Sequence, residues 1–395
     1  MAPPDAFHGL DELTLAHQRV LIRVDFDVPL DAEGNVSSDR KLRAALPTIN
    51  KVLKEGARVV LATHLGRPSE PVSLEPVAER LAELLGQEVY LPDECVGDAA
   101  RKVVSDLREG QLCLLENLYF EAGEAQNDDS FARKLLALCD VYVGEAFGSA
   151  HLTQASLVAL PRMMVERGVG VHFKAELAAL TRATQSAQKP FVGILGGAKL
   201  SQALPMLEAM LRRCDVILLG GGVANTLLAA RSVDMKESPV EKEQLALGRA
   251  LLSRARDQRV ELVLPVDVSV GSSPEAAEST SVSVGSIPDG TGAFDIGART
   301  LDAFRGQLGR AQLVLWHGAL GVCENPTFAA GTLGLLSALG EAAAFGVVTG
   351  DSVAAAATAQ GSELESKIGF VSAGGVASLV FIEGKKLPGV EALRG

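Results

Sequence analysis

Charged and imidazole side chains follow the aliphatic runs in the first half of the chain. They stand in RVDFDVPL, THLGRP and AFGSAH, and they are Arg23, Asp25, Asp27, His64, Arg67 and His151. A charge at the end of a buried strand is costly unless a partner or a ligand compensates it. We therefore expect these groups to bind a small anion. The alternative for Arg23 and Asp25 is an ion pair that only caps the strand.

Glycine-rich turns follow the aliphatic runs of the second half. They read LGGAK (195–199), LGGGVAN (219–225), WHGALG (316–321) and TGDS (349–352). Glycine lets backbone N–H groups approach a phosphate closely, and the helix that follows adds a partial positive charge. Together the turns predict a nucleotide site, although any single one is also compatible with packing alone. Neither G-x-x-x-x-G-K-[ST] nor G-x-G-x-x-G occurs, so no nucleotide fingerprint adds support.

Asp351, which follows Gly350 directly, is the candidate metal-binding residue. Its carboxylate is placed to hold Mg²⁺ while the metal rests on nucleotide phosphates. The structural alternative is an ordinary helix N-cap.

Hydrophobic periodicity predicts the elements that position these groups. Strands are expected over 19–24, 57–64, 88–91, 111–117 and 140–147, and again over 190–197, 214–222, 260–270, 312–318, 343–350 and 367–375. Between them lie segments with apolar residues at i, i+3, i+4 and i+7, for example 43–56 and 241–259. This alternation predicts right-handed parallel crossovers, in which ligands bind outside the carboxyl ends of the strands.

Length and composition predict two α/β domains. The chain has 395 residues, more than the roughly 250 to 300 at which one core stops growing. Hydrophobic residues make up 47% and aromatic residues 4%, so we expect aliphatic cores of the kind found in parallel α/β layers. Segment 172–188 has helix period and ends at Lys189-Pro190, which predicts a helix connecting the two domains.

Charge and cysteine content exclude some partners and compartments. The formal net charge of −12 argues against nucleic acid or an anionic membrane, because either would repel the chain. The five cysteines are widely spaced and form no C-x-x-C pattern, which predicts free thiols in a reducing compartment. The N-terminus lacks the pattern of a signal peptide, and no uncharged apolar run reaches about 18 residues. We expect a soluble cytoplasmic protein.

Read in order, these segments resemble the phosphoglycerate kinase family over nearly the whole chain. The resemblance rests on RVDF, RAALPTI, THLGRP, GGAK, PVDV and the ending EGKKLPGVEAL, among others. It implies two Rossmann-like, doubly wound parallel-sheet domains: an acid-substrate domain (1–171), an interdomain helix (172–188) and a nucleotide domain (189–375). Segment 376–395 would return to the first domain.

The resemblance also implies an activity and its ligands. Members of this family transfer a phosphoryl group between ATP and the carboxylate of 3-phosphoglycerate, giving 1,3-bisphosphoglycerate, and closure of a hinge brings the substrates together. The expected cofactor is Mg²⁺ with ATP or ADP. We expect a monomer that binds these small molecules and neither nucleic acid nor a membrane.

The same resemblance assigns roles to individual residues. Arg23, Lys41 and Lys199 would be catalytic. The acid would be bound by Arg23, Asp25, Asp27, Lys41, His64, Arg67, Tyr119, His151 and Leu152. The nucleotide would be bound by Gly196, Gly197, Lys199, Gly220, Gly221, Gly222, Gly297, His317, Glu324, Gly350, Asp351 and Ser352, with Asp351 holding Mg²⁺ through the nucleotide.

Several of these positions depart from the family pattern. On the acid side, Asp27 replaces an asparagine, Lys41 replaces an arginine, and Tyr119 and Leu152 replace two further arginines. On the nucleotide side, Ala203 replaces a lysine, His317 an asparagine and Ala319 a proline. Loss of two phosphate-binding arginines is expected to weaken phosphoglycerate binding by roughly 10² to 10⁴-fold. Loss of one donor to a developing charge costs about 10² to 10³ in rate.

Three interpretations follow. In the first, the chain retains the family reaction with impaired efficiency. In the second, it phosphorylates a different carboxylate that lacks the 3-phosphate, for which Tyr119 and Leu152 form a more neutral pocket. In the third, it is a non-catalytic nucleotide-binding paralogue that acts by domain closure.

Overall fold

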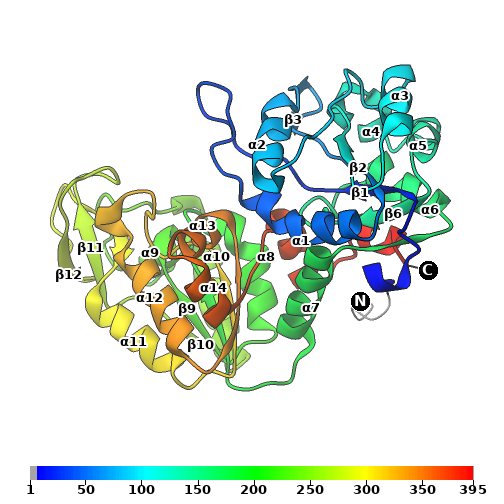
Figure 1. Cartoon of the computed structure of the whole chain (residues 1–395). Helices are drawn as coiled ribbons and strands as arrows, with labels where there is room; N and C mark the ends of the chain where they lie inside the picture. The colour runs from blue at the N-terminus through cyan, green and yellow to red at the C-terminus, as the bar shows by residue number, and fades with distance from the viewer. Residues whose placement is uncertain (1–6, 395) are drawn as a thin grey trace. The chain divides into compact units, whose positions relative to one another are not determined.

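The structure is a computed structural model that describes residues 7–394. The chain divides into two compact units (Figure 1). The first unit comprises the residues up to Ala178 together with those from Gly384 onward. The second unit spans Ala179–Glu383. No helix within the described residues is long and apolar enough to cross a membrane.

The first unit is built on a parallel sheet with strand order β5-β2-β1-β6-β7. Its strands are β1 (Arg19–Arg23), β2 (Arg58–Ala62), β5 (Leu112–Leu114), β6 (Val141–Gly144) and β7 (Arg167–Val169). Val20, Leu21 and Ile22 of the central strand are fully buried. Because helices cover both faces of such a sheet, its strands are apolar on both sides, which explains the unbroken aliphatic runs.

Helices connect these strands, as the periodicity predicts. The helices of the first unit are α1 (Arg40–Lys54), α2 (Glu75–Leu85), α3 (Asp98–Asp106), α4 (Ala122–Ala125), α5 (Asp129–Leu136), α6 (Leu160–Met163) and α16 (Pro388–Ala392), with a π-helical turn over Ala155–Ala159. A short hairpin of β3 (Gly66–Arg67) and β4 (Glu70–Pro71) follows β2. Helix α7 (Val171–Gln185) begins in the first unit and ends in the second.

The second unit is built on a parallel sheet with strand order β10-β9-β8-β14-β15-β16. Its strands are β8 (Phe191–Leu195), β9 (Val216–Leu219), β10 (Glu261–Val263), β14 (Leu313–His317), β15 (Phe345–Thr349) and β16 (Gly369–Val371). A separate antiparallel sheet consists of β11 (Asp267–Gly271), β12 (Thr280–Ser283) and β13 (Gly292–Ile296). The core packs around Trp316 and Phe304, which are fully buried.

The helices of the second unit surround this sheet (Figure 1). They are α8 (Leu200–Leu211), α9 (Gly221–Ala230), α10 (Leu245–Asp257), α11 (Ala298–Leu308), α12 (Ala330–Glu341), α13 (Asp351–Ala359), α14 (Ser362–Ile368) and α15 (Gly375–Ile382). Helices α8, α9 and α13 each follow a strand of the parallel sheet within a few residues. The doubly wound α/β class predicted from the sequence is therefore confirmed.

Two predicted strands are wrong in detail. Segment 88–91 forms no strand, because only Tyr90 makes a bridge, with Cys113. Segment 260–270 is not one strand but two, since β10 joins the parallel sheet and β11 belongs to the antiparallel one. Pro265 lies between them and lacks the N–H that a continuous central strand would use.

Candidate functional site

A cavity of about 540 Å³ lies in the second unit, where strands β14 and β15 end and α9, α13 and α15 begin. Its lining includes Gly197, Ala198, Gln202, Gly221, Gly222, Pro239, Ala293, Phe294, His317, Gly318, Ala319, Gly321, Val322, Glu324, Gly350, Asp351, Ser352, Gly375, Val376 and Leu379. This is the edge of a parallel sheet at which ligands bind.

Several helix N-termini face this cavity. Gly221 and Gly222 begin α9, Asp351 and Ser352 begin α13, and Gly375 begins α15. The first N–H groups of a helix have no partner within it, and the helix dipole adds a partial positive charge there. Converging helix starts therefore favour an anionic group such as a chain of phosphates.

The glycines of these turns are required by close packing. A Cβ atom on Gly222 would lie 2.0 Å from the Ala198 carbonyl oxygen, and one on Gly196 would lie 1.9 Å from that of Ala319. Gly350 has φ 93°, which other residues rarely adopt. The floor of the cavity is therefore largely backbone. The N–H groups of Gly197 and Gly221 in this floor donate to the carbonyls of Ala319 and Leu320, both at 2.8 Å.

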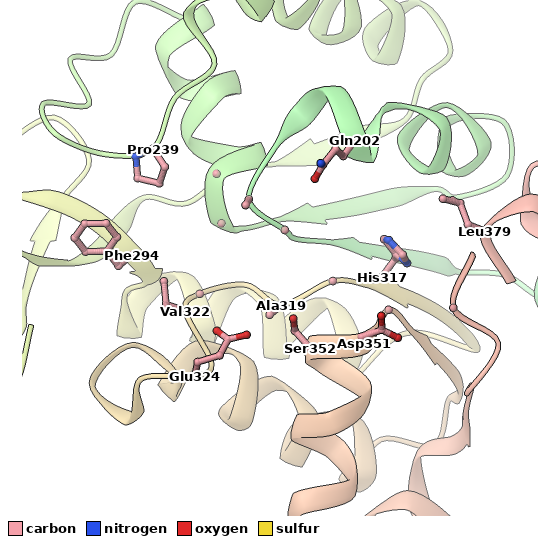
Figure 2. A pocket seen from close by; sticks show the side chains of 18 of the residues that line it. Gln202, Pro239, Phe294, His317, Ala319, Val322, Glu324, Asp351, Ser352 and Leu379 are labelled. Atoms are coloured by element: carbon pink, nitrogen blue, oxygen red, sulfur yellow. The ribbon is translucent and has the colours of Figure 1, made fainter. Parts of the chain in front are cut away.

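The opposite side of the cavity is apolar. Figure 2 shows Pro239, Phe294 and Val322 together on one side, away from His317 and Asp351. Glu324 reaches the cavity below Val322. An elongated ligand with a flat apolar group at one end and phosphates at the other suits this arrangement.

Not every predicted nucleotide residue lines the cavity. Gly197, Gly221, Gly222, His317, Glu324, Gly350, Asp351 and Ser352 do, whereas Gly196, Lys199, Gly220 and Gly297 are outside its lining. Lys199 is exposed at the N-cap of α8. Gly297 is packed against Asp267, whose carboxyl carbon would lie 2.3 Å from an added Cβ.

Sequence reasoning missed other lining residues. Pro239, Phe294, Val376 and Leu379 come from segments that carry no glycine-rich strand end or charge of the kind that marked the rest. Gly375 ends the predicted strand 367–375, and the final Gly-Gly of that strand is a signal that could have found it. Gln202 was also missed, although it lies one residue before Ala203. Ala203 itself is 6% exposed and does not line the cavity.

His317 has a defined hydrogen-bond partner. The Thr349 hydroxyl donates to the Trp316 carbonyl (3.2 Å), so it accepts from Nδ1 of His317 at 3.0 Å. This arrangement leaves Nε2 of the neutral ring as an acceptor. Burial lowers the pKa of His317, although the charge of Asp351 opposes that effect.

A second set of predicted residues gathers at the carboxyl end of β1 in the first unit. Arg23 is fully buried, and its Nε donates to the Ser156 hydroxyl (2.7 Å) while Nη2 donates to Nδ1 of His64 (2.7 Å). Its Nη1 also donates to the Val24 carbonyl. Burial and the charge of Arg23 lower the pKa of His64 to about 3, so this imidazole is neutral.

Asp25 pairs with Lys41 and not with Arg23, which is the partner that a strand-capping ion pair would use. It lies 3.3 Å from Lys41 Nζ, and no ion pair joins it to Arg23 within residues 7–394. Burial alone would raise the pKa of Asp25, but the charges of Lys41 and Arg23 hold it below its usual value. The ion-pair alternative for Arg23 and Asp25 is therefore wrong.

The two positions where arginines were expected hold neutral groups. The ring of Tyr119 stacks on His64 with centroids 4.5 Å apart, and its hydroxyl accepts from Gln154 Nε2 at 2.7 Å. Leu152 packs against the apolar cluster that contains Leu157 and Val158. It contributes to packing, because its neighbours in that cluster are apolar.

The remaining acid-site residues have these positions. Asp27 Oδ1 accepts the Gly66 N–H (3.0 Å), and Arg67 is exposed next to it. His151 Nδ1 donates to the Gly148 carbonyl at 2.9 Å, and burial lowers its pKa. 

Residues 10–385 match the family described as phosphoglycerate kinase. The chain belongs to the phosphoglycerate kinase family. It is 45% identical to the phosphoglycerate kinase of Anaeromyxobacter sp. (strain Fw109-5), with 99% of this chain and 100% of the relative covered. The phosphoglycerate kinase of Microcystis aeruginosa (strain NIES-843 / IAM M-2473) is 41% identical, with 99% of each chain covered.

Solved structures give the same family. The phosphoglycerate kinase from Coxiella burnetii matches with TM-score 0.84 and 33% identity over 98% of both chains. That from Pyrococcus horikoshii OT3 matches with TM-score 0.81 and 30% identity over 97% of this chain and 98% of the other. Family and relatives indicate a kinase, and the two-domain phosphoglycerate kinase fold is shown.

The second-unit cavity of this phosphoglycerate kinase family member fits a magnesium nucleotide. The helix starts and the glycine floor suit phosphates, and Asp351 and Glu324 supply carboxylate oxygens, which Mg²⁺ prefers. Among the described residues, no cluster of three His, Cys, Asp or Glu side chains could hold a metal without a ligand.

Proposed function

We propose that the chain transfers the γ-phosphoryl group of ATP to the carboxylate of 3-phosphoglycerate, giving ADP and 1,3-bisphosphoglycerate, with impaired efficiency. The observation that carries this proposal is the cavity where α9, α13 and α15 begin, in a chain of the phosphoglycerate kinase family. Cytoplasmic location and a monomeric state stay predictions from the sequence.

In the proposed reaction a carboxylate oxygen forms a bond to the γ-phosphorus, and the bond from that phosphorus to the β,γ-bridging oxygen breaks. Catalysis of such a transfer consists mainly of positioning and of stabilising charge. We assign the cations to Arg23, Lys41 and Lys199. Mg²⁺, held by Asp351 through the nucleotide, would neutralise phosphate charge when bound.

The proposed loss of efficiency follows from the cations. Ala203 supplies no charge, and one missing donor to a developing charge costs about 10² to 10³ in rate. Lys41 keeps a charge but not the planar fork of an arginine, and it is paired with Asp25. Of the positions assigned to the acid substrate, Arg67 supplies a cation, whereas Tyr119 and Leu152 are neutral.

A coupled assay with ATP, Mg²⁺ and 3-phosphoglycerate tests the proposal. We expect turnover that is measurable but at least about 10²-fold below an ordinary kinase rate near 10² s⁻¹. Turnover below about 10⁻⁴ of that rate, with ADP still bound in a calorimeter, would favour the non-catalytic nucleotide-binding alternative. Failure to bind ADP at millimolar concentration would exclude both.

A further inference from the structure

Arg23 is joined to a buried carboxylate through one serine. Its Nε donates to the Ser156 hydroxyl at 2.7 Å, and that hydroxyl donates in turn to Oε1 of Glu124 at 2.5 Å. The Ser156 N–H also donates to Oε2 of Glu124, at 2.9 Å. All three residues are fully buried. Because Arg23 ends β1, Ser156 lies in the π-helical turn and Glu124 lies in α4, these hydrogen bonds link three separate segments.

The directions of these hydrogen bonds follow from the chemistry of the donors. A guanidinium can only donate, so the Ser156 oxygen accepts from Arg23 and its single proton is left for Glu124. Both oxygens of Glu124 accept, which suits a carboxylate better than a protonated acid. Burial raises the pKa of Glu124, and the charge of Arg23 opposes that rise. Glu124 is therefore a countercharge that reaches Arg23 through Ser156.

The other end of the guanidinium sets the state of His64. Nη2 of Arg23 donates to Nδ1 of His64 at 2.7 Å, so Nδ1 carries a lone pair and no proton. The imidazole is neutral, and its one proton is therefore on Nε2. His64 is 4% exposed, and no partner for Nε2 lies within residues 7–394. The Nε2–H group is thus the donor that His64 can offer to an acid.

Glu124 also keeps Arg23 from a competing carboxylate. The charge of Arg23 acts on Asp25, although no ion pair joins the two side chains within the described residues. A buried cation without its countercharge is costly, so Asp25 would become the partner of Arg23 if Glu124 were neutral. Arg23 would then release Nδ1 of His64. Asp25 would at the same time be drawn away from Lys41.

We propose that Glu124 is a positioning residue for the acid site. Acting through Ser156, it holds the guanidinium of Arg23 away from Asp25. Arg23 in turn fixes the tautomer of His64 that carries its proton on Nε2. The tautomer is a property of the protein alone. Its effect on catalysis rests on the proposed function, because there His64 donates to the acid substrate.

Nitrogen NMR of the isotope-labelled full chain reads the tautomer directly, because protonated and unprotonated ring nitrogens have well-separated chemical shifts. The chain has six histidines, so the signals of His64 are identified by their loss in His64→Gln. At neutral pH we expect the wild type to carry the His64 proton on Nε2. A ring protonated on Nδ1 would overturn the inference without any further variant.

Two variants test the link to Glu124. Glu124→Gln removes the charge but keeps an oxygen for the Ser156 hydroxyl, and Ser156→Ala removes the link itself. In each variant the population of His64 protonated on Nδ1 should rise by about tenfold, because a charge-assisted hydrogen bond to Nδ1 is weakened. A rise in Ser156→Ala alone would overturn the role of Glu124, and a rise in neither would overturn the whole inference.

Glu121→Gln is the matched control. It removes the same charge from the N-cap of the same short helix, where the Glu121 side chain is 40% exposed. Its charge is screened by solvent, so the tautomer of His64 should not change. A change equal to that in Glu124→Gln would show a general effect of charge and would contradict the specific link.

Kinetics test the consequence for the reaction. In the coupled assay, Glu124→Gln should raise KM for 3-phosphoglycerate by about five- to tenfold. KM for ATP, whose proposed site lies in the second unit, should change by less than about twofold. A variant that only loses folded protein would have a lower apparent kcat and unchanged KM values.

The two measurements separate this inference from the proposed function. If the tautomer shifts in Glu124→Gln while KM for the acid is unchanged, the role in the acid site is overturned and the proposed function stands. If the wild type shows no turnover, the proposed function fails, and the NMR result still decides whether Glu124 sets the tautomer of His64.

Discussion

Arg23 shows how a single residue can be both buried and charged. Its guanidinium is fully buried, and its hydrogen bonds go to Ser156, His64 and the Val24 carbonyl. Because each nitrogen has a partner, the desolvation cost is offset. The same bonds fix the ring of His64, on which Tyr119 stacks. Arg23 therefore orients its neighbours, and the exposed Arg67 and the half-buried Lys41 are the more accessible cations.

Ala203→Lys should raise phosphoglycerate turnover by about tenfold or more, because it restores a cation in the first turn of α8. The measurement is kcat in the coupled assay, with the unfolding midpoint as a check that α8 still folds. Leu211→Lys at the far end of the same helix is not a suitable control, because Leu211 is buried. Gln202→Ala is used instead, because it alters the neighbouring position without adding a cation. An unchanged kcat in a folded Ala203→Lys variant would contradict the proposed role.

Gly222→Ala should weaken ADP binding by at least about tenfold, because the new Cβ would lie 2.0 Å from the Ala198 carbonyl oxygen and would force the turn apart. Gly306→Ala is the matched control, since an added Cβ meets nothing within 4 Å on α11. The control should gain roughly 0.5 to 1 kcal/mol of stability and bind ADP normally. Calorimetry and thermal unfolding measure both. Equal ADP affinity in the two variants would show that the turn does not hold the nucleotide.

Among the elements, β13 and α12 are joined by a buried carboxylate. Asp295 at the end of β13 accepts the N–H of Gly331, in the first turn of α12, at 2.7 Å, and the Ile296 N–H at 2.8 Å. A Cβ on Gly321 or Gly331 would lie 2.4 Å from Oδ1 of Asp295. The chain therefore approaches this carboxylate so closely that only glycine fits.

Burial raises the pKa of Asp295 to about 7, although the N–H groups of Gly331 and Ile296 oppose that rise. The folded state thus binds a proton more tightly than the unfolded chain, in which the pKa is near 3.8. The contribution of Asp295 protonation to the free energy of unfolding is fully present below about pH 4. It is lost as the pH rises through 7, and the total loss is roughly 4 kcal/mol. Fluorescence of Trp316 should show the second unit losing stability between pH 5.5 and 8.

Asp295→Asn is the matching variant for this pH dependence. This variant should be less stable at all pH values, because its amide nitrogen cannot accept a hydrogen bond from one of the two N–H groups. The gap between the wild type and the variant should narrow from pH 5.5 to pH 8. A gap that does not change with pH would contradict the raised pKa.

The elements were predictable from the sequence where a regular pattern runs through a segment. Aliphatic runs such as 19–24 and 312–318 became strands because a parallel sheet buries both faces. Segment 88–91 is also largely apolar, but only Tyr90 forms a bridge, with Cys113, and composition cannot report how far a strand pairs with its neighbour. The glycine turns marked the cavity, whereas the apolar side at Phe294 and the packing of Leu152 depend on contacts between distant segments.

At the scale of the whole chain, residues from its two ends form one unit. The Gly389 N–H donates to the Ala150 carbonyl (2.9 Å), and Arg167 Nη2 donates to the Arg394 carbonyl (2.6 Å). Leu393 fills the space beside Gly144 of β6, where an added Cβ would lie 2.7 Å from its side chain. The first unit is therefore completed only after the second has been synthesised.

Leu393→Ala should destabilise the first unit by about 2 to 5 kcal/mol, because it leaves a cavity beside β6. Trp316, the one tryptophan of the chain, lies in the second unit, so its fluorescence should report an unchanged transition there. Far-UV circular dichroism reports on both units. It should show that loss of secondary structure in the variant begins under milder conditions than in the wild type. Lys386→Ala is the control, since this side chain is 79% exposed, and it should change stability by less than about 0.5 kcal/mol. If the fluorescence and dichroism transitions of Leu393→Ala shift together by the same amount, the two units unfold as one and this division of the chain does not describe its stability.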